Sequence, residues 1–363
     1  MHENYYAVIM AGGGGTRLWP LSNRQRPKQM LTLGRERTLF QMAVDRLRGV
    51  FPLDRILVVT VDVQAREYQK QYPEIPETNY LIEPMPRGTA AVVGLASAAL
   101  LARDPQATMA ILTADHMIEN EQRFRDYLEA AMETAHEGYL VTLGIEPAYP
   151  ATGYGYIQRG EMLRDDTGRL AYRVQRFREK PNFELAEKMV EGGDHYWNSG
   201  MFIWRADRIM DAFQQHMPEL YTNLMDIREA WDTGRHTGVI ERIWPLIKPE
   251  TIDYGIMEHA ANVVVLPAID IGWNDVGSWD SIFEIYPHDA HGNIVIGAQH
   301  LNLDSTRSLI VGDTSNRLIV TIGMEGIIVI DTGNALLICP RGESQRVKEA
   351  VARLKEQGMQ KYQ

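Results

Sequence analysis

Cysteine is almost absent from this sequence, and so are the hydrophobic segments that secretion or membrane insertion requires. Cys339 is the single cysteine among 363 residues, so no disulfide can form within the chain, as is usual in a reducing compartment. No uninterrupted apolar run reaches the roughly 20 residues of a transmembrane helix. The N-terminus also lacks the basic and apolar regions of a signal peptide. We therefore expect a cytoplasmic protein with no membrane partner.

Positive charge is also scarce, except in one short segment. The chain carries 37 Lys and Arg against 48 Asp and Glu, and the formal net charge of -11 argues against nucleic acid as a partner. Between residues 17 and 37, however, the basic residues outnumber a single acid, Glu36. They are Arg17, Arg24, Arg26, Lys28, Arg35 and Arg37. Such a segment in an acidic protein predicts a small polyanionic ligand, although for Arg35 and Arg37 we favour ordinary solvated side chains.

Two common phosphate-binding motifs are missing from the glycine-rich stretch at residues 12–15. The dinucleotide fingerprint G-x-G-x-x-G fails because its last position is Arg17 or Leu18, depending on the starting glycine. The P-loop motif fails because no lysine follows the glycines before Lys28. These absences exclude a dehydrogenase with that fingerprint and a P-loop ATPase.

What the sequence does contain here is an apolar run that leads into consecutive glycines. The run Tyr5–Met10 predicts a buried strand, and residues 12–15 are all glycine. Such glycines allow a tight turn whose successive N–H groups form a concave site for phosphate. Arg17 follows as a forked donor for phosphate oxygens. A flexible surface turn is the alternative, which we favour less because a strand and the pair Thr16-Arg17 flank the glycines.

Strand and helix patterns alternate along the first part of the chain, which predicts an α/β fold. We expect a parallel sheet with helices on both faces and an active site beyond the carboxyl ends of the strands. The expected strands are Tyr5–Met10, 55–60, 79–83, Thr108–Thr113 and 139–144, and the expected helices are 40–49, 65–72, 90–103 and 124–136. Beyond residue 287, short apolar runs alternate with turn residues, which predicts a small all-β domain with a closing helix at 344–357. We therefore divide the chain into domains 1–287 and 288–363.

Two segments resemble the signature of a known enzyme family. They are Gly12 to Ser22, with the sequence GGGGTRLWPLS, and Pro27-Lys28-Gln29, and they resemble the sugar-1-phosphate nucleotidylyltransferases. The Trp-Pro-Leu-Ser and Pro-Lys-Gln details are most similar to members that combine GTP with mannose 1-phosphate. The resemblance covers nearly all of the chain and implies a Rossmann-like nucleotidyltransferase domain with a mixed, mainly parallel sheet. It also implies a short β-helix-like C-terminal domain that serves in packing or dimerisation, so we expect a homodimer. From the length of the chain we expect no isomerase domain of the kind that bifunctional members carry.

The resemblance implies that residues after the first and third strands hold the nucleotide. Glu83 ends the third strand, where its carboxylate can accept hydrogen bonds from the ring N–H and the exocyclic amine of guanine. This chain has Gly88 where the family has Asn, whereas Thr89 matches the family and is a suitable N-cap for the helix that follows. The nucleotide-binding residues that we expect are Ala11, Gly12, Gly13, Gly14, Gly15, Thr16, Glu83 and Thr89.

Asp115 and Asp275 are the candidate metal ligands. Asp115 follows the fourth strand, and Asp275 lies in a turn of sequence Trp-Asn-Asp-Val-Gly. Taken alone, the first is more often a cap or turn residue, and the second is typical of an Asx-turn. Both match aspartates through which the family binds its metal. We expect Mg²⁺, which favours carboxylate and phosphate oxygens.

The sugar phosphate is expected to bind to residues beyond position 150. Gly153 begins a Gly-Tyr-Gly sequence, which indicates either a close backbone approach to a ligand or a β-bulge. Glu179-Lys180-Pro181 and Asn198-Ser199-Gly200 resemble family motifs, although Glu179 and Lys180 alone would be an ordinary surface pair. The resemblance implies that Glu179 and Asn198 bind sugar hydroxyls and that Lys180 binds the phosphate. Residues 251–258 resemble a segment that closes the sugar pocket.

Together these resemblances imply the transfer of GMP from GTP to α-D-mannose 1-phosphate, which gives GDP-mannose and pyrophosphate. An oxygen of the sugar phosphate would attack the α-phosphorus in line, and positioning and charge neutralisation would provide the catalysis. The expected catalytic residues are Arg17, on the leaving phosphates, and Lys28, beside the reacting centre. The use of another nucleoside triphosphate or hexose phosphate as substrate stays open as an alternative. So do a non-catalytic sugar-nucleotide sensor and, least favoured, a β-helix acyltransferase.

Overall fold

The computed structural model describes residues 3–13, 15–23, 25–164, 170–313 and 317–362. The predicted nucleotide-binding residue Gly14 and the basic residue Arg24 lie outside these described residues. The chain forms two compact units and passes between them repeatedly: unit 1 comprises residues 1–12, 44–113 and 118–273, and unit 2 comprises residues 13–43, 114–117 and 274–363. The division into domains at residue 287 stays a prediction.

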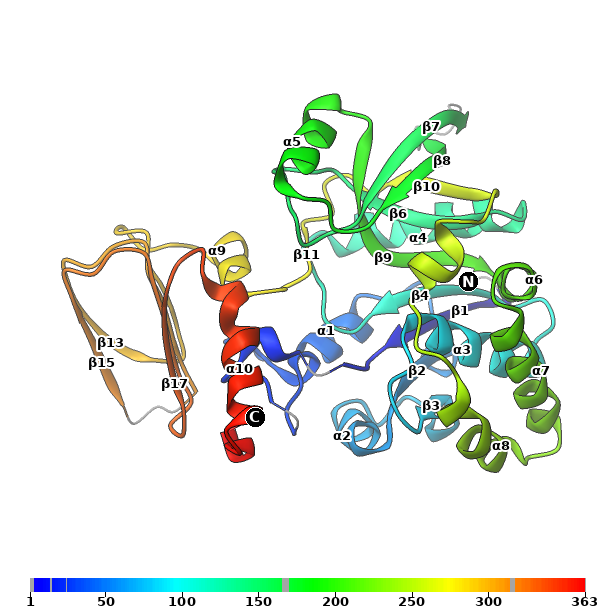
Figure 1. Ribbon diagram of the computed structural model, residues 1–363, viewed down its shortest axis with the longest axis horizontal. Coiled ribbons are helices and arrows are strands. Elements are labelled where there is room, and N and C mark those ends of the chain that lie inside the picture. Colours follow the sequence, from blue (N-terminus) through cyan, green and yellow to red (C-terminus); the bar gives the residue numbers. More distant parts are fainter. Residues whose placement is uncertain (1–2, 14, 24, 165–169, 314–316, 363) are drawn as a thin grey trace. The chain divides into compact units, whose positions relative to one another are not determined.

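Unit 1 is built on a nine-stranded sheet of mixed, mainly parallel strands, as predicted (Figure 1). Strands β3, β2, β1 and β4 run parallel to one another, and β9 joins β4 to β6 through two antiparallel pairings. The order across the sheet is β3-β2-β1-β4-β9-β6-β10-β8-β7. The strands are β1 Tyr5–Met10, β2 Ile56–Val61, β3 Tyr80–Glu83, β4 Thr108–Thr113, β6 Leu140–Ile145, β7 Tyr156–Arg164, β8 Ala171–Arg178, β9 His195–Arg205 and β10 Val263–Pro267.

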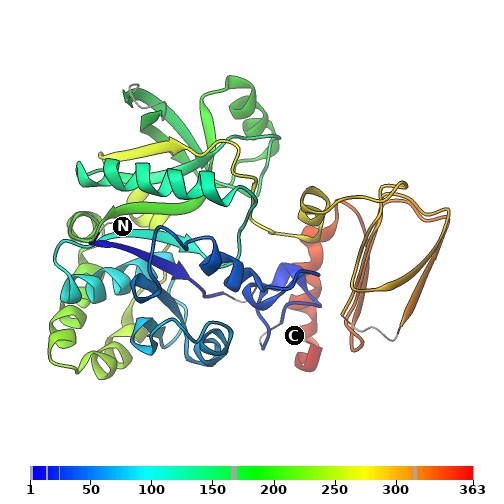
Figure 2. The ribbon, with the colours of Figure 1, turned by 180° about the vertical axis from the view of Figure 1, so that it is seen from behind.

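Helices cover both faces of this sheet. Tyr6 and Val8 of β1 face α3 (Thr89–Arg103), against which α6 (Ala206–His216) and α7 (Pro218–Asp232) pack. Tyr5 faces the opposite side, where its hydroxyl donates to the carbonyl oxygen of Leu128 at 2.9 Å. Leu128 belongs to α4 (Glu121–His136), which Figure 2 shows lying along the sheet. The other helices of unit 1 are α2 Asp62–Gln71, α5 Phe183–Gly192 and α8 His236–Ile243, and α1 Leu39–Asp45 contains the point in the chain where unit 2 gives way to unit 1.

The predicted elements of this part agree closely with the observed ones, with one clear exception. The predicted strands match β1, β2, β3, β4 and β6 to within one residue because each is a short, almost wholly buried apolar run. The helix predicted at 40–49 ends already at Asp45, and turns follow it. Among the described residues, no helix has the length and apolar character of a transmembrane span.

Unit 2 contains the predicted all-β region, which forms short stacked strands. Strands β12 Ile294–Ile296, β14 Leu309–Gly312 and β16 Ile327–Asp331 pair in parallel, and β17 Leu336–Pro340 adds an antiparallel edge. A second sheet pairs β13 Gln299–Leu303 with β15 Leu318–Ile322 in parallel (Figure 1). Helix α10 (Val347–Glu356) follows them. This arrangement confirms the predicted β-rich C-terminal region.

The segment after the glycine-rich loop shares a hydrophobic core with these strands. Leu18 and Leu31 from the N-terminal part of unit 2 cluster with Trp279, Leu309 and Ile328, and all five side chains are fully buried. The indole N–H of Trp279 also donates to the carbonyl oxygen of Trp19 at 3.0 Å. Burial of several large apolar side chains is the main source of stability for such a unit. The loop segment is therefore anchored by residues about 250 to 310 positions away in the sequence.

Candidate active site

The chain leaves β1 through backbone that neighbouring side chains fix. The N–H of Ala11 donates to the carbonyl oxygen of Val59 at 2.9 Å, and the Thr60 hydroxyl donates to the carbonyl oxygen of Ala11, also at 2.9 Å. At Gly12, an added Cβ would lie 3.2 Å from Oε1 of Glu83. The first glycine of the loop therefore allows the backbone to pass close to this carboxyl group.

Further along the loop, within unit 2, Gly15 has a left-handed backbone with φ of 50°. A Cβ there would lie 2.6 Å from Cβ of Lys28, so glycine is required by both the backbone and the space. Thr16 and Arg17 follow in a short 3₁₀ turn and are exposed. Among the described residues, Arg17 has no ion-pair partner, so its guanidinium can serve an external anion.

Lys28 contacts the carboxylate of Asp115 and the backbone of Asp275. Its ammonium lies 2.8 Å from Oδ2 of Asp115 and donates a hydrogen bond to the backbone carbonyl oxygen of Asp275. Lys28 is 8% exposed, so its ammonium is largely shielded from water, whereas the Asp115 side chain is partly exposed. The three residues belong to unit 2 but come from three separate segments of the chain. The structure therefore brings together Lys28, Asp115 and the turn at Asp275.

Asp115 is held in its charged form. Its burial works to raise the pKa of the carboxyl, but the charges of Lys28 and His116 and the hydrogen bond from Lys28 outweigh burial, and the pKa is lowered. A pKa that is shifted by a specific charged partner is a common feature of functional sites.

The turn at Asp275 is an Asx-turn, the alternative considered from the sequence. Its Oδ1 accepts a hydrogen bond from the N–H of Gly277 at 2.9 Å. Val276 has a positive φ of 48°, which is rare and strained for a β-branched residue. Its N–H donates to Oδ1 of Asn274 at 2.7 Å, which helps to hold the strained turn.

Glu83 lies at the end of β3 with an unusual environment for a carboxyl. It is 2% exposed, and burial raises its pKa to about 7, although a hydrogen bond from the backbone of Arg87 partly opposes this. Among the described residues no donor reaches its Oε2. Buried polar atoms are nearly always paired, so an unpaired one beside a glycine loop points to an external donor.

The N-cap prediction for Thr89 is wrong. Helix α3 begins at Thr89 itself, and Gly88 occupies the N-cap position with φ of 83°. The Thr89 hydroxyl instead accepts a hydrogen bond from the N–H of Ile252 at 2.9 Å. A tertiary contact across 163 residues has replaced the local one that the sequence suggested.

The predicted sugar-side residues lie together in unit 1. Glu179 forms an ion pair with Lys180, whose backbone has a positive φ of 43°. An added Cβ at Gly155 would overlap the Glu179 carboxylate, whereas Gly153 has open space around its Cβ position. Gly155, which we did not select, is thus the glycine required by a close approach. The N–H of Asn198 donates to the carbonyl oxygen of Gly155 at 2.8 Å, which links the two motifs.

Asp253 is a further polar residue of this group that the sequence did not single out. Nδ2 of Asn198 donates to its Oδ1 at 2.6 Å. Burial and then the charge of Glu179 raise the pKa of Asp253, although the hydrogen bond from Asn198 and the charge of Lys180 oppose them. Asp253 opens a short π-helical turn, Asp253–Met257, within the segment expected to close the sugar pocket. Only the resemblance of that segment could have drawn attention to it.

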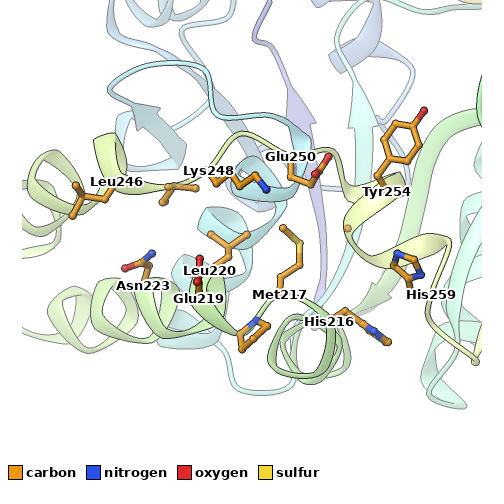
Figure 3. A pocket seen from close by; sticks show the side chains of 13 residues that line it. His216, Met217, Glu219, Leu220, Asn223, Leu246, Lys248, Glu250, Tyr254 and His259 are labelled. Atoms are coloured by element: carbon orange, nitrogen blue, oxygen red, sulfur yellow. The ribbon is translucent and has the colours of Figure 1, made fainter.

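A cavity of about 430 Å³ lies in unit 1 on the other side of this segment. Figure 3 shows Met217 and Glu219, at the start of α7, facing Lys248 and Glu250 across it. None of the predicted site residues lines this cavity.

Two family models match successive parts of the chain. A family model described as "Nucleotidyl transferase" matches residues 6–292, and one described as "MannoseP isomerase/GMP-like beta-helix domain" matches residues 298–354. The chain is 37% identical over 362 residues to a mannose-1-phosphate guanylyltransferase of Escherichia coli K12, covering 98% of this chain and 75% of the relative. It is 36% identical over 358 residues to the alginate biosynthesis protein AlgA of Pseudomonas aeruginosa PAO1, covering 98% and 73%.

A solved structure is also similar over nearly its whole length. It is a crystal structure from Thermus thermophilus, described as a mannose-1-phosphate geranyltransferase. The TM-score is 0.86 at 32% sequence identity, and the match covers 97% of this chain and 99% of that one. The fold and the resemblance inferred from the glycine-rich signature are therefore confirmed.

Proposed function

This chain belongs to the nucleotidyl transferase family, and from that membership we propose that it transfers GMP from GTP to α-D-mannose 1-phosphate. The products would be GDP-mannose and pyrophosphate. The observation that carries the proposal is the convergence of Lys28, Asp115 and Asp275 in the unit that also holds the glycine-rich loop after Gly12. Charges of both signs, kept close together, suit a reaction between two polyphosphate or phosphate anions.

Guanine selection is assigned to Glu83. As a carboxylate it can accept hydrogen bonds from the ring N–H and the exocyclic amine of guanine, and its unpaired Oε2 supports this role. Gly13, Gly15 and Thr16 would offer backbone or hydroxyl donors to the triphosphate, and Ala11 and Gly12 would carry the backbone past the nucleotide. Thr89 would act near the base from the first turn of α3.

A divalent metal, which we propose is Mg²⁺, would be held by Asp115 and Asp275. The residues fit this ion because both are carboxylates, and Asp115 is kept ionised by its neighbours. When bound, the ion would neutralise charge on the phosphate oxygens of the nucleotide. Lys28 now neutralises Asp115, and its flexible side chain can turn its ammonium toward a phosphate when the carboxylate has another partner.

The sugar phosphate would bind on the side of Glu179 and Asn198. Their polar groups can hydrogen-bond sugar hydroxyls, while the exposed ammonium of Lys180 can bind the phosphate. Gly153 has open space beside it, which would allow a ligand to approach its backbone. Asp253 would fix Asn198 through their 2.6 Å hydrogen bond.

In the reaction, an oxygen of mannose 1-phosphate would form a bond to the α-phosphorus of GTP while the bond from that phosphorus to the β-phosphate bridging oxygen breaks. The leaving pyrophosphate would take that electron pair. Arg17 would bind the leaving phosphates, and Lys28 would stabilise the charge that develops around the α-phosphorus. No covalent intermediate with the protein is required.

The direct test is a pyrophosphate-release assay with Mg²⁺, one sugar 1-phosphate and one nucleoside triphosphate at a time. We expect the highest kcat/KM with GTP and mannose 1-phosphate, and no release when the metal is removed with a chelator. A preference for another pair would make the chain a nucleotidylyltransferase of different specificity. No release with any pair would favour a non-catalytic sugar-nucleotide sensor.

We also propose that the protein is a cytoplasmic homodimer. The outer face of the β13–β15 sheet carries Leu301, Leu303, Leu318, Val320 and Ile322, all of them more than 40% exposed. The register pairs Leu301 with Val320 and Leu303 with Ile322, so the apolar side chains form adjacent rows. Such a face is rarely left in water, and a second copy would cover it with an identical apolar surface.

A further inference from the structure

Residues 244–253, which we call the strap, run beside the loop of residues 85–90. The indole N–H of Trp244 donates to the carbonyl oxygen of Met85 at 2.8 Å. In return, the guanidinium of Arg87 donates to two carbonyl oxygens of the strap, to Trp244 at 3.2 Å and to Pro245 at 2.6 Å. The side chain of Arg87, a residue that lies between Glu83 and Thr89 in the sequence, is thus bonded to the strap.

A second set of contacts lies farther along the strap. The N–H of Glu250 donates to the carbonyl oxygen of Arg87, and the N–H of Ala90 donates to the carbonyl oxygen of Glu250, both at 3.2 Å. The N–H of Ile252 then reaches the Thr89 hydroxyl at 2.9 Å. These exchanges fix the strap against the loop at both the backbone and the first turn of α3.

Gly88 makes this close approach possible. Its φ of 83° and ψ of 166° lie in a region that is essentially open only to glycine. An added Cβ would overlap the carbonyl oxygen of Glu250. The glycine that replaces the family's asparagine in this chain therefore has a structural purpose, because it lets the strap and the loop pair.

The far end of the strap reaches the sugar side. Asp253 accepts the 2.6 Å hydrogen bond from Asn198, one residue after the contact of Ile252 with Thr89. Arg87, in the loop that the near end of the strap contacts, donates a hydrogen bond from its backbone to Glu83. One continuous segment therefore contacts the residues assigned to the base and the residue assigned to the sugar.

The strap is not held from behind by close packing along its whole length. Leu246, Lys248 and Glu250 line the cavity of about 430 Å³, across from the start of α7 (Figure 3). Trp244, Ile247 and Ile252 anchor the strap in the hydrophobic core, so the hydrogen bonds from the loop act on the stretches between these anchors. The bonds from Arg87 are the charged ones and so are expected to count most.

We propose that Arg87 is a positioning residue that fastens the strap to the base-side loop and so sets the placement of Glu83 and Asn198 together. The inference rests on the proposed function for the identity of the two substrates. Loss of Arg87 would loosen the strap at the loop, and the effect would reach Asn198 through Asp253. Binding of the nucleotide and binding of the sugar phosphate would both weaken, although Arg87 touches neither substrate.

The test measures KM for GTP and for mannose 1-phosphate separately in the wild type, Arg87→Ala and Arg87→Lys. For Arg87→Ala we expect both KM values to rise on the order of tenfold, the size that loss of charged hydrogen bonds predicts, while kcat at saturation changes little. Arg87→Lys should recover part of the loss because its ammonium can reach one of the two carbonyl oxygens. Wild-type turnover establishes the proposed function independently of this result.

The matched control is Arg103→Ala. Arg103 also donates from its guanidinium to one neutral acceptor, Oδ1 of Asn79 at 2.9 Å, but at the opposite end of α3 from Thr89. We expect both KM values to stay at the wild-type level. A rise in the KM of GTP alone in Arg87→Ala would mean that Arg87 contacts the nucleotide and would overturn the proposal, and so would no change in either KM.

If Arg87→Ala does not fold, Trp244→Phe tests the same point, because it removes the hydrogen bond to Met85 and keeps an aromatic ring in a fully buried position. We expect a smaller rise that is again shared by both substrates. A wild-type KM for mannose 1-phosphate in a folded Trp244→Phe variant with a raised KM for GTP would contradict the role of the strap.

Discussion

At the scale of single residues, Glu83 shows how burial and function are connected. A carboxyl that is buried without a full set of partners keeps its proton to a higher pH, here with a pKa of about 7. Only the ionised form can accept hydrogen bonds from both donors of guanine. Guanine would provide the donors that the Glu83 carboxylate lacks, so binding of guanine should favour the ionised form and lower the pKa of Glu83.

This leads to a prediction about pH. Between pH 8 and pH 6 the fraction of ionised Glu83 falls about tenfold, so the KM for GTP should rise by about the same factor. The measurement is the steady-state KM for GTP across this range at saturating mannose 1-phosphate. In Glu83→Gln the KM for GTP should be high and should not change with pH between 6 and 8. An equally steep pH dependence in that variant would mean that another group controls binding.

The same carboxyl has a consequence for stability that provides a second readout. The folded protein holds the Glu83 proton up to a pKa of about 7, whereas the ordinary value is 4.5. Between these pH values the folded state thus binds more protons than the unfolded chain. The contribution of Glu83 to the free energy of unfolding therefore falls as the pH rises through this window. The difference in the free energy of unfolding between Glu83→Gln and the wild type should therefore be more favourable to the variant at pH 8 than at pH 5. Chemical denaturation of both proteins at the two pH values measures this difference.

Arg17 and Lys28 allow a prediction about turnover. Arg17→Ala removes a donor assigned to the leaving phosphates, and Lys28→Ala removes one assigned to the reacting centre. Each should lower kcat by roughly 10²–10³-fold at saturating substrates, as for single donors that stabilise developing charge elsewhere. Arg26→Ala is the matched control, because Arg26 lies in the same basic segment but pairs with Asp313 on the surface at 3.0 Å. An unchanged kcat in Arg17→Ala would remove that residue from the catalytic machinery.

At the scale of elements, local sequence predicted the strands well and the polar contacts less well. The buried runs Tyr5–Met10 and Thr108–Thr113 specify strands by composition alone. The role of the Thr89 hydroxyl could not be found in this way, because Ile252 is its partner. Asp253 was not selected for a similar reason, since its importance comes from Asn198, which lies on strand β9. Hydrogen bonds between distant segments leave no periodic signal in a sequence.

The loop that precedes α3 gives a prediction about stability. Gly88→Ala combines a backbone conformation reserved for glycine with an overlap on Glu250, so it should lower the free energy of unfolding by about 2–4 kcal/mol. Gly193→Ala is the control, because Gly193 also has a positive φ of 67° but open space around its Cβ position. It should cost about 1 kcal/mol. If chemical denaturation gave equal losses in the free energy of unfolding for the two variants, the contact of Gly88 with Glu250 would not contribute to stability.

At the scale of the whole molecule, the candidate site depends on chain segments that no spacing rule connects. Lys28, Asp115 and Asp275 are far apart in the sequence, and each has an ordinary structural interpretation by itself. The resemblance to a known family selected them, and the structure places the carboxylate of Asp115 and the backbone carbonyl oxygen of Asp275 at the ammonium of Lys28. The α/β class, by contrast, followed from the alternation of strands and helices alone. The site could be inferred only by adding information that the physical pattern of one sequence does not contain.

The apolar face of the β13–β15 sheet carries the last prediction, which concerns the assembly. If a second copy covers this face, a charge placed in its centre must be buried without a partner on association, which is costly. Leu301→Lys combined with Val320→Lys should therefore convert the dimer to a monomer, measured by light scattering after size-exclusion chromatography over a range of concentrations. Both side chains are about half exposed in the single chain, at 48% and 45%, so the fold itself should tolerate the change. Leu336→Lys is the control, because Leu336 is 51% exposed in β17, which belongs to the other sheet of the same unit. A dimer that persists in the double variant but dissociates in Leu336→Lys would move the interface to the β17 side, and a wild-type monomer at all concentrations would exclude a homodimer.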